Sequence, residues 1–447
     1  MTISVTEYLL IRLNELGVDT VFGVPGDYNL SLLDPIVNSK DLQWIGNCNE
    51  LNSAYAADGY ARIKGIGALI TTFGVGELSA INGIAGAFAE HVPVVNIVGM
   101  PALFLQNKKL FLHHNLTQDN FLNFLNMHVP VTAAQGMLNQ QHPGAEIDRL
   151  LTVCWREKQP VYIGIPADIA GMQIEPPPQS LDVSGCKTDP DALNEAVEHI
   201  VSLLQAAKNP VVVIDAYPER FQAMPLVKEF INTTQLPFVT TPMGKALMDE
   251  THPNFLGMYI GNLSAEPILQ QVESSDCLIY FGWIRSDVNT GLFTSSYNSN
   301  HSIDIQKSSV RVRNSHYLNV DMNAVISLLI ERVKPKHNQI PSQLPKSAEP
   351  YIPTENNLTI ERLWQRLHLF FQEEDVILAE VGTSLYGLLE TQLPKNVKVI
   401  SQIIWSSIGY TLGALLGAMV ARSTSTAHFS YRGWVATSYR ARTLYYA

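Results

Sequence analysis

The first third of the chain alternates short apolar runs with segments of helical periodicity. Ser4 and Glu7 form a capping box ahead of a helical pattern that stops at Gly17. The pattern beyond Gly17 predicts strands at 20–24, 43–46, 68–72 and 93–98 and helices at 30–36, 50–64 and 76–90. Strands that alternate with helices predict a parallel sheet covered by helices on both faces.

Two linkers divide the chain into three such α/β units. The prolines at 176–178 end the first unit, and the Pro-, Lys-, Ser- and Gln-rich stretch 334–357 ends the second. Strands are predicted at 210–215, 237–240 and 277–281 in the second unit and at 376–380 and 397–400 in the third, with helices at 225–233 and 358–372. We therefore predict domains at 1–178, 190–335 and 357–421, followed by a tail at 422–447.

One uncharged segment, 403–421, reaches the length of a membrane-spanning helix. Serines, glycines, a tyrosine and a threonine interrupt its apolar character, and its first half has the pattern of a strand end and a turn. We therefore interpret it as a buried strand–turn–helix rather than a membrane span.

Composition narrows the class of protein further. The net charge of −11 argues against nucleic-acid or anionic-membrane partners. The four cysteines lie far apart in the sequence, at Cys48, Cys154, Cys186 and Cys277, which argues against a zinc site or a disulfide scaffold. The N-terminus shows no signal peptide. Both observations predict a cytoplasmic protein.

Four motifs of the first unit and two of the third resemble one enzyme family. They are Val-Pro-Gly-Asp-Tyr-Asn-Leu at 24–30, the Asn-Glu-Leu-Asn helix with Asp58-Gly59-Tyr60-Ala61-Arg62, Gly-Val-Gly-Glu-Leu-Ser-Ala at 74–80, Leu-His-His at 112–114, Glu-Val-Gly-Thr-Ser at 380–384 and Trp-Ser-Ser-Ile-Gly at 405–409. Over residues 1 to 421 the chain resembles the thiamine-diphosphate-dependent pyruvate and indolepyruvate decarboxylases. The resemblance implies a pyrimidine-binding domain, a middle Rossmann-like domain and a diphosphate-binding domain, with thiamine diphosphate and Mg²⁺ as cofactors.

Glu50 is the residue to which the resemblance gives the central catalytic role. A carboxylate that hydrogen-bonds the ring nitrogen of the aminopyrimidine favours the imino tautomer, which acts as the base at the thiazolium. Taken alone, Glu50 only complements the dipole of the helix that it begins. Together with the other motifs, it is expected to be catalytic.

Asp27, His113 and His114 match the family's proton-relay cluster. Decarboxylation leaves a carbanion equivalent that must be protonated before an aldehyde leaves, and histidine titrates near neutrality. A random His-His pair is more often a surface or structural feature, and an Asp in a Pro-Gly-Asp turn normally bonds the backbone. The presence of all three residues in family order favours catalysis, although the sequence after His114 differs from the family's usual Thr-Leu-Gly-Asn-Gly.

The remaining candidates are expected to bind the cofactor. Thr72 ends a strand at the edge where open α/β sheets bind ligands. By resemblance, Thr383 and Ser384 bind the diphosphate, Ile408 is the apolar wedge that bends the cofactor, and Ser406 replaces a family glycine whose carbonyl contacts it. Family active sites lie between subunits, which implies a homodimer or homotetramer with Glu50 and His113 from one chain and Thr383 and Ile408 from the other.

The family's metal-binding sequence, Gly-Asp-Gly-Ser followed by Asn-Asn, is absent. No Asp or Glu follows Glu390, and apolar periodicity is lost after Arg422. Codons for 428–443 can be chosen so that the neighbouring frame contains Gly-Asp-Gly-Ser, with the single-codon residue Trp434 inside the match. We therefore hypothesise a frameshift near Arg422 that truncates the third domain and impairs activity.

The expected reaction is non-oxidative decarboxylation of a 2-oxo acid, pyruvate first, to an aldehyde and CO₂. One alternative is a carboligase of the acetolactate-synthase type, against which the His113-His114 pair argues, because protonating the carbanion competes with ligation. Another is a non-catalytic remnant that associates with an intact paralogue.

Overall fold

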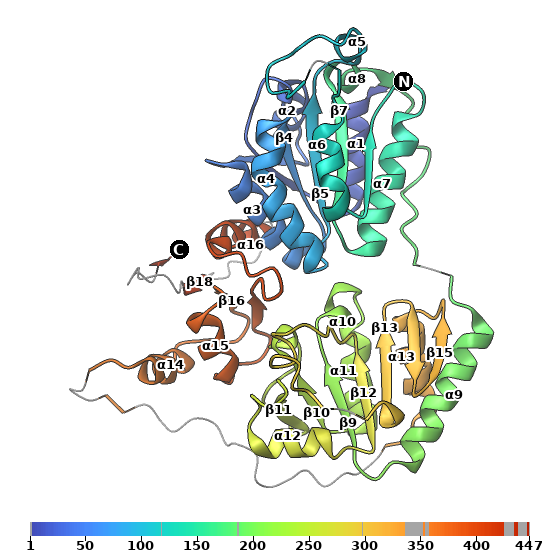
Figure 1. Cartoon of the computed structure of the whole chain (residues 1–447), viewed down its shortest axis with the longest axis vertical. Coiled ribbons are helices and arrows are strands. Elements are labelled where there is room, and N and C mark those ends of the chain that lie inside the picture. Colours follow the sequence, from blue (N-terminus) through green and yellow to red (C-terminus); the bar gives the residue numbers. More distant parts are fainter. Residues whose placement is uncertain are drawn as a thin grey trace. The chain divides into compact units, whose positions relative to one another are not determined.

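The computed structural model describes residues 2–117, 119–185, 187–296, 298–335, 352–353, 357–423, 433–436 and 445–446. It forms two compact units, one comprising Met1–Ser184 with Ile400–Ala447 and the other Gly185–Val399 (Figure 1). Cys186, most of the second linker and most of the tail lie outside the described residues. Of residues 428–443, whose codons carry the frameshift hypothesis, only 433–436 are described. The three predicted domain boundaries stay a prediction.

The first unit contains a six-stranded parallel sheet in the order β3-β2-β4-β5-β7-β6. Its strands are β2 (Thr20–Gly23), β3 (Gln43–Gly46), β4 (Gly67–Thr72), β5 (Val94–Met100), β6 (Ala134–Met137) and β7 (Val161–Pro166). The two-stranded β1 (Ile3–Ser4) and β8 (Gln173–Ile174) pair separately. The completely buried β4, β5 and β7 confirm the expectation of a sheet covered on both faces.

Helices supply those two covers. One apolar core joins the sheet to α1 and α7, and another joins it to α3 and α4. The helices are α1 (Val5–Glu15), α2 (Leu30–Val37), α3 (Glu50–Lys64), α4 (Val75–Ala89), α5 (Leu103–Asn107), α6 (Asn123–His128), α7 (Pro143–Glu157) and α8 (Ala167–Ala170), with a 3₁₀ turn η1 (Val129–Val131).

The first unit also includes α16 (Tyr410–Ser423), which packs along α3. A buried polar network holds the preceding segment: Arg62 pairs with Asp58 at 2.7 Å and donates to the Ser401 carbonyl at 3.2 Å. The Glu90 carboxylate accepts from the Ile404 amide at 2.6 Å. Residues 401–409 contain turns but no strand, because the preceding strand ends at Ile400. The turn and the helix of the predicted strand–turn–helix are therefore confirmed, and its strand is wrong. No helix among the described residues is long and apolar enough to cross a bilayer.

Small residues allow α3 and α16 to approach closely, which gives a stability prediction. A Cβ atom on Gly417 would lie 1.8 Å from the Ala56 carbonyl oxygen. Helix propensity alone would favour Gly417→Ala by about 1 kcal/mol, but overpacking against backbone should outweigh it and lower the free energy of unfolding by about 2 kcal/mol. Urea denaturation measures the change, with Gly171→Ala as control, because nothing lies within 4 Å of that position. Equal stability of both variants would contradict the close packing.

The second unit contains a seven-stranded sheet in the order β11-β10-β9-β12-β13-β14-β15. Its first five strands are parallel, whereas β14 and β15 are antiparallel, a hairpin edge that the sequence analysis did not predict. The strands are β9 (Pro210–Ile214), β10 (Phe238–Thr240), β11 (Phe255–Met258), β12 (Cys277–Phe281), β13 (Ser302–Gln306), β14 (Ser309–Val312) and β15 (Ser315–Leu318).

The helices of this unit cover its sheet, and a small group of elements follows them in the chain. The helices are α9 (Pro190–Ala206), α10 (Tyr217–Arg220), α11 (Met224–Thr234), α12 (Glu266–Glu273) and α13 (Met322–Arg332), with 3₁₀ turns η2 (Pro242–Gly244) and η3 (Ser299–His301). The later elements are α14 (Ile360–His368), β16 (Val376–Ala379), α15 (Thr383–Glu390) and β17 (Lys398–Ile400); the short β18 (Gly433–Ala436) and β19 (Tyr445–Tyr446) follow α16.

Candidate active site

The carboxyl edge of the six-stranded sheet carries every catalytic candidate of the first unit. Asp27 follows β2, Glu50 follows β3 and Thr72 ends β4. His113 and His114 lie in the loop between α5 and α6, beyond β5. Because carboxyl ends of parallel strands share one edge, the topology gathers residues from four separate segments, as expected for a ligand site of an open α/β sheet.

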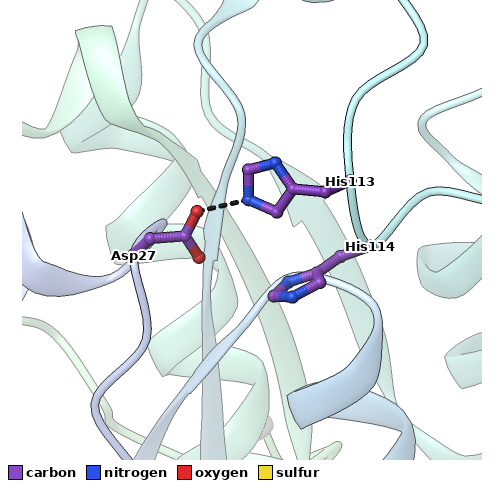
Figure 2. A group of neighbouring side chains, drawn as sticks. All are labelled: Asp27, His113 and His114. Carbon is purple, nitrogen blue, oxygen red and sulfur yellow. Dashed lines mark hydrogen bonds and ion pairs between the residues drawn. The ribbon is translucent and has the colours of Figure 1, made fainter.

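Asp27, His113 and His114 form one cluster (Figure 2). The His113 Nε2 atom is hydrogen-bonded to the Asp27 carboxylate, and the His114 ring meets His113 edge-on with 4.8 Å between centroids. The His113 and Asp27 side chains are 59% and 48% exposed, so a substrate could reach them. Two imidazoles and a carboxylate in contact can accept, hold and pass on a proton.

Tyr28, which was not among the predicted site residues, supports His113. Its ring stacks on the imidazole with 4.8 Å between centroids, and its hydroxyl lies 3.3 Å from Nδ1 of His113. Burial, with the nearby Asp27 charge, raises the pKa of Tyr28 to about 12, so the hydroxyl stays protonated. A hydroxyl that donates to Nδ1 leaves Nε2 of His113 to carry the proton toward Asp27.

The turn that carries Asp27 is fixed by the fully buried Asn29. Its side-chain oxygen accepts from the Gly26 amide at 2.9 Å, and its amide group donates to the Val24 carbonyl at 3.0 Å. A Cβ on Gly26 would lie 2.6 Å from that of Thr72, so glycine lets this turn lie directly on the end of β4. The position of Asp27 is therefore set by packing as well as by hydrogen bonds.

Glu50 and Thr72 provide polar atoms without protein partners. Glu50 is the first residue of α3, behind the N-cap Asn49, and its Oε1 atom lies 3.3 Å from the Cβ position of Gly76. Among the described residues its carboxylate has no hydrogen bond or ion pair. The Thr72 hydroxyl is buried and likewise unpartnered within the described chain. Free polar atoms at this edge fit a polar ligand such as an aminopyrimidine.

Behind the edge, Glu77 is a fully buried acid on the first turn of α4. Its carboxylate accepts from the Gly74 amide at 2.8 Å and from the Tyr162 hydroxyl at 2.9 Å. His128 Nδ1 lies 3.8 Å from it. Burial raises the pKa of Glu77 to about 7 and lowers the pKa of His128.

The raised pKa of Glu77 predicts a pH-dependent stability. Between its ordinary value of 4.5 and about 7, folded Glu77 holds a proton that the unfolded chain releases. The free energy of unfolding therefore falls as pH rises through this window, by about 3 kcal/mol for this group. Glu77→Gln cannot ionise and should lose less stability between pH 5 and pH 8, as measured by urea denaturation. Identical pH dependence in both proteins would refute the assignment.

Comparison with known proteins identifies the family of this chain. Residues 3–125 match the thiamine pyrophosphate enzyme N-terminal TPP binding domain, and residues 197–332 match the central domain. The chain is 42% identical to the pyruvate decarboxylases of Candida glabrata and Hanseniaspora uvarum, over 432 and 427 residues. It is 41% identical to pyruvate decarboxylase isozyme 3 of Saccharomyces cerevisiae over 428 residues. These matches cover 94% of the chain and 75 to 76% of the relatives.

The chain belongs to the thiamine-diphosphate-dependent pyruvate decarboxylase family. The family prediction, the α/β fold class and the assignment as a carboxy-lyase are thereby confirmed. Membership of the family implies thiamine diphosphate and Mg²⁺ as cofactors. The carboligase and remnant alternatives are not favoured.

The cofactor-binding residues predicted for the third domain lie in two segments of the chain, the two diphosphate ligands in one and the wedge residue with its neighbour in the other. Thr383 and Ser384 begin α15 behind Gly382, where free backbone amides suit an anion. Ser406 has φ +54°, a left-handed conformation that explains why glycine suits this position. The Ile408 residue is 57% exposed. Its segment is bound to α3 by a 2.6 Å hydrogen bond between Ser407 and Tyr55. It is bound to α4 by a 2.9 Å hydrogen bond that Trp405 donates to Asn82.

The residues present fit the pyrimidine of the family's cofactor but not its metal ion. Mg²⁺ takes carboxylate, carbonyl, phosphate and water oxygens, and the sequence from Thr391 onward contains no Asp or Glu. The Asp27 cluster offers one ligand atom from each residue within 4.8 Å, but two are histidine nitrogens, which Mg²⁺ does not favour. No step is therefore derived through a metal ion.

Two features of this site escaped the sequence analysis. Tyr28 and Glu77 both occur in the family motifs, yet neither was given a role. An aromatic residue next to a predicted catalytic Asp is a usable signal for Tyr28. The burial of Glu77 has no local signal, because a Glu three residues after a helix cap is normally exposed.

Proposed function

We propose that this protein decarboxylates pyruvate to acetaldehyde and CO₂ without oxidation. The observation that carries the proposal is the Asp27–His113–His114 cluster on the same sheet edge as Glu50, whose carboxylate has no partner within the described part of the chain. The names of the relatives support pyruvate among 2-oxo acids.

Each side chain is assigned a separate task. When bound, thiamine diphosphate supplies the electron sink that lets the carboxylate of a 2-oxo acid depart as CO₂. Glu50 binds the ring nitrogen of the aminopyrimidine and fixes its tautomer. His113 and His114 deliver the proton that completes the aldehyde, and Asp27 orients the His113 ring through their hydrogen bond.

The cofactor-binding residues and the assembly are part of the same proposal. Thr72, Thr383, Ser384, Ser406 and Ile408 contact the cofactor, and the protein acts as a homodimer or homotetramer in the cytoplasm. Oligomers are typical of the family, and the dispersed cysteines suit a reducing compartment. We also retain the division into domains 1–178, 190–335 and 357–421 with an out-of-frame tail at 422–447.

Aldehyde release from a panel of 2-oxo acids tests the substrate. Pyruvate should give the highest kcat/KM, followed by indolepyruvate and branched-chain 2-oxo acids, with one CO₂ formed for each aldehyde. Aldehyde can be followed by its reduction with NADH and alcohol dehydrogenase. A larger kcat/KM for an aromatic or branched substrate would reject pyruvate, and 2-hydroxy ketone as the main product would reject decarboxylation to free aldehyde.

A further inference from the structure

The buried acid behind the sheet edge is connected to the catalytic loop through one glycine. Gly74 has φ +69°, and a Cβ there would lie 2.3 Å from the carbonyl oxygen of His114. The backbone of His114 thus rests directly on Gly74, which no side-chain-bearing residue could replace without displacing the loop. The amide of Gly74 is in turn held by Glu77 at 2.8 Å.

The loop residue that rests on this turn is itself constrained. His114 has φ +65°, in the left-handed region, where a residue with a side chain needs support from its surroundings. Its Nδ1 atom is buried and has no hydrogen-bond partner among the described residues. No hydrogen bond from the described chain to Nδ1 fixes the ring, which is held by edge-on contacts with His113 and Tyr28 at 4.8 and 6.0 Å between centroids and by the support of its backbone.

Glu77 is held from its other side by two buried groups. Tyr162, from β7, donates to its second oxygen at 2.9 Å. His128, at the end of α6, donates from Nδ1 to the Phe124 carbonyl at 2.8 Å, which fixes that nitrogen as the protonated one. Its Nε2 atom is buried without a partner in the described chain. The titratable groups that face this region are His128, Tyr162 and, beside Gly76, Glu50.

Helix capping alone does not account for this arrangement. Glu7 has the same role in α1, where it accepts from Ser4 at 2.7 Å, and it does so exposed to solvent. Burying an acid is unfavourable unless its hydrogen bonds compensate, and an exposed Glu would cap α4 as well. Because Glu77 is buried, its carboxylate holds the Gly74 amide inside the protein, at the turn that contacts the His114 backbone.

We propose that Glu77 is a positioning residue for His114, which it holds through the Gly74 turn with Tyr162 as its anchor. The catalytic meaning of this inference rests on the proposed proton-relay role of His114. The positioning of His114 by Glu77 can be measured without turnover, so this proposal and the proposed function can fail separately.

The test uses the full 447-residue chain labelled with ¹⁵N-histidine. The imidazole of His114, assigned with His114→Gln, is observed by NMR in the unsubstituted protein and in Glu77→Leu, Glu77→Gln and Tyr162→Phe. Glu77→Leu should change the imidazole ¹⁵N chemical shifts of His114 and speed amide exchange at 112–117 by about tenfold, as expected for a lost buried hydrogen bond. Tyr162→Phe should give a smaller change of the same sign.

Two comparisons separate positioning from general loss of structure. Glu77→Gln keeps an acceptor for the Gly74 amide and should restore the ¹⁵N chemical shifts of His114 and the exchange rates. Glu7→Leu removes the equivalent cap in α1 and should leave both unchanged. An unaltered His114 in Glu77→Leu, or equal changes in Glu7→Leu, would overturn the proposal. If Glu77→Leu does not fold, Tyr162→Phe decides, and an unchanged His114 in that folded variant overturns it.

Discussion

Restoring the neighbouring reading frame beyond Arg422 should raise pyruvate decarboxylation by about a thousandfold over the 447-residue chain. A metal ion that bridges phosphates contributes several kcal/mol through charge neutralisation, and 1.4 kcal/mol corresponds to about tenfold in rate. The 447 residues offer no carboxylate after Glu390 for that ion. Acetaldehyde formation in saturating thiamine diphosphate and Mg²⁺ measures the gain, and cofactor titration should show tighter binding.

The first step of that experiment is to determine the DNA sequence around codon 422. If the neighbouring frame does not encode Gly-Asp-Gly-Ser, the frameshift hypothesis ends there. A gene shifted into the remaining third frame is the control and should stay inactive. Micromolar binding of thiamine diphosphate by the 447-residue protein, with turnover equal to that of the restored protein, would contradict the impairment.

Much of the fold could be predicted from local pattern. Strands buried on both faces give continuous apolar runs, and the predicted 277–281 coincides with the fully buried β12. The predicted 43–46 coincides with β3, a partly exposed strand at the edge of the first sheet. The hairpin of β14 and β15 could not be read this way. β14 alternates half-buried and buried residues, whereas β15 has no buried residue. Each strand covers only four positions, which is too short a stretch to distinguish from a loop.

The residues of the active site could be predicted from the sequence only in part. Asp27, Glu50 and the two histidines are recognisable as a set because their order along the chain resembles a known family. Their convergence on one edge follows from a parallel sheet once the strands are placed. The role of Glu77 could not be predicted from the sequence, because its buried environment includes Tyr162, which lies 85 positions further along the chain. Packing between residues so far apart in the chain produces no recognisable pattern in the sequence around Glu77.

The second large effect is expected from Glu50→Gln. An amide of nearly the same shape cannot hold the pyrimidine tautomer as a carboxylate does, so kcat should fall by about 10² to 10⁴, the usual range for a lost acid–base group. The measurement is acetaldehyde formation by the frame-restored protein, together with thiamine diphosphate affinity, which should change far less than kcat.

A matched variant distinguishes catalysis from a helix-dipole role of the same carboxylate. Glu266 is the first residue of α12, as Glu50 is of α3, so Glu266→Gln removes an equivalent charge from a helix N-terminus. Loss of a dipole interaction changes only the free energy of unfolding, by about 0.3 to 1 kcal/mol. Glu266→Gln should therefore leave kcat unchanged. If Glu50→Gln also lost only this stability and kept its kcat, Glu50 would have no part in the chemistry, because a carboxylate required at the pyrimidine nitrogen cannot be replaced by an amide without slowing the reaction.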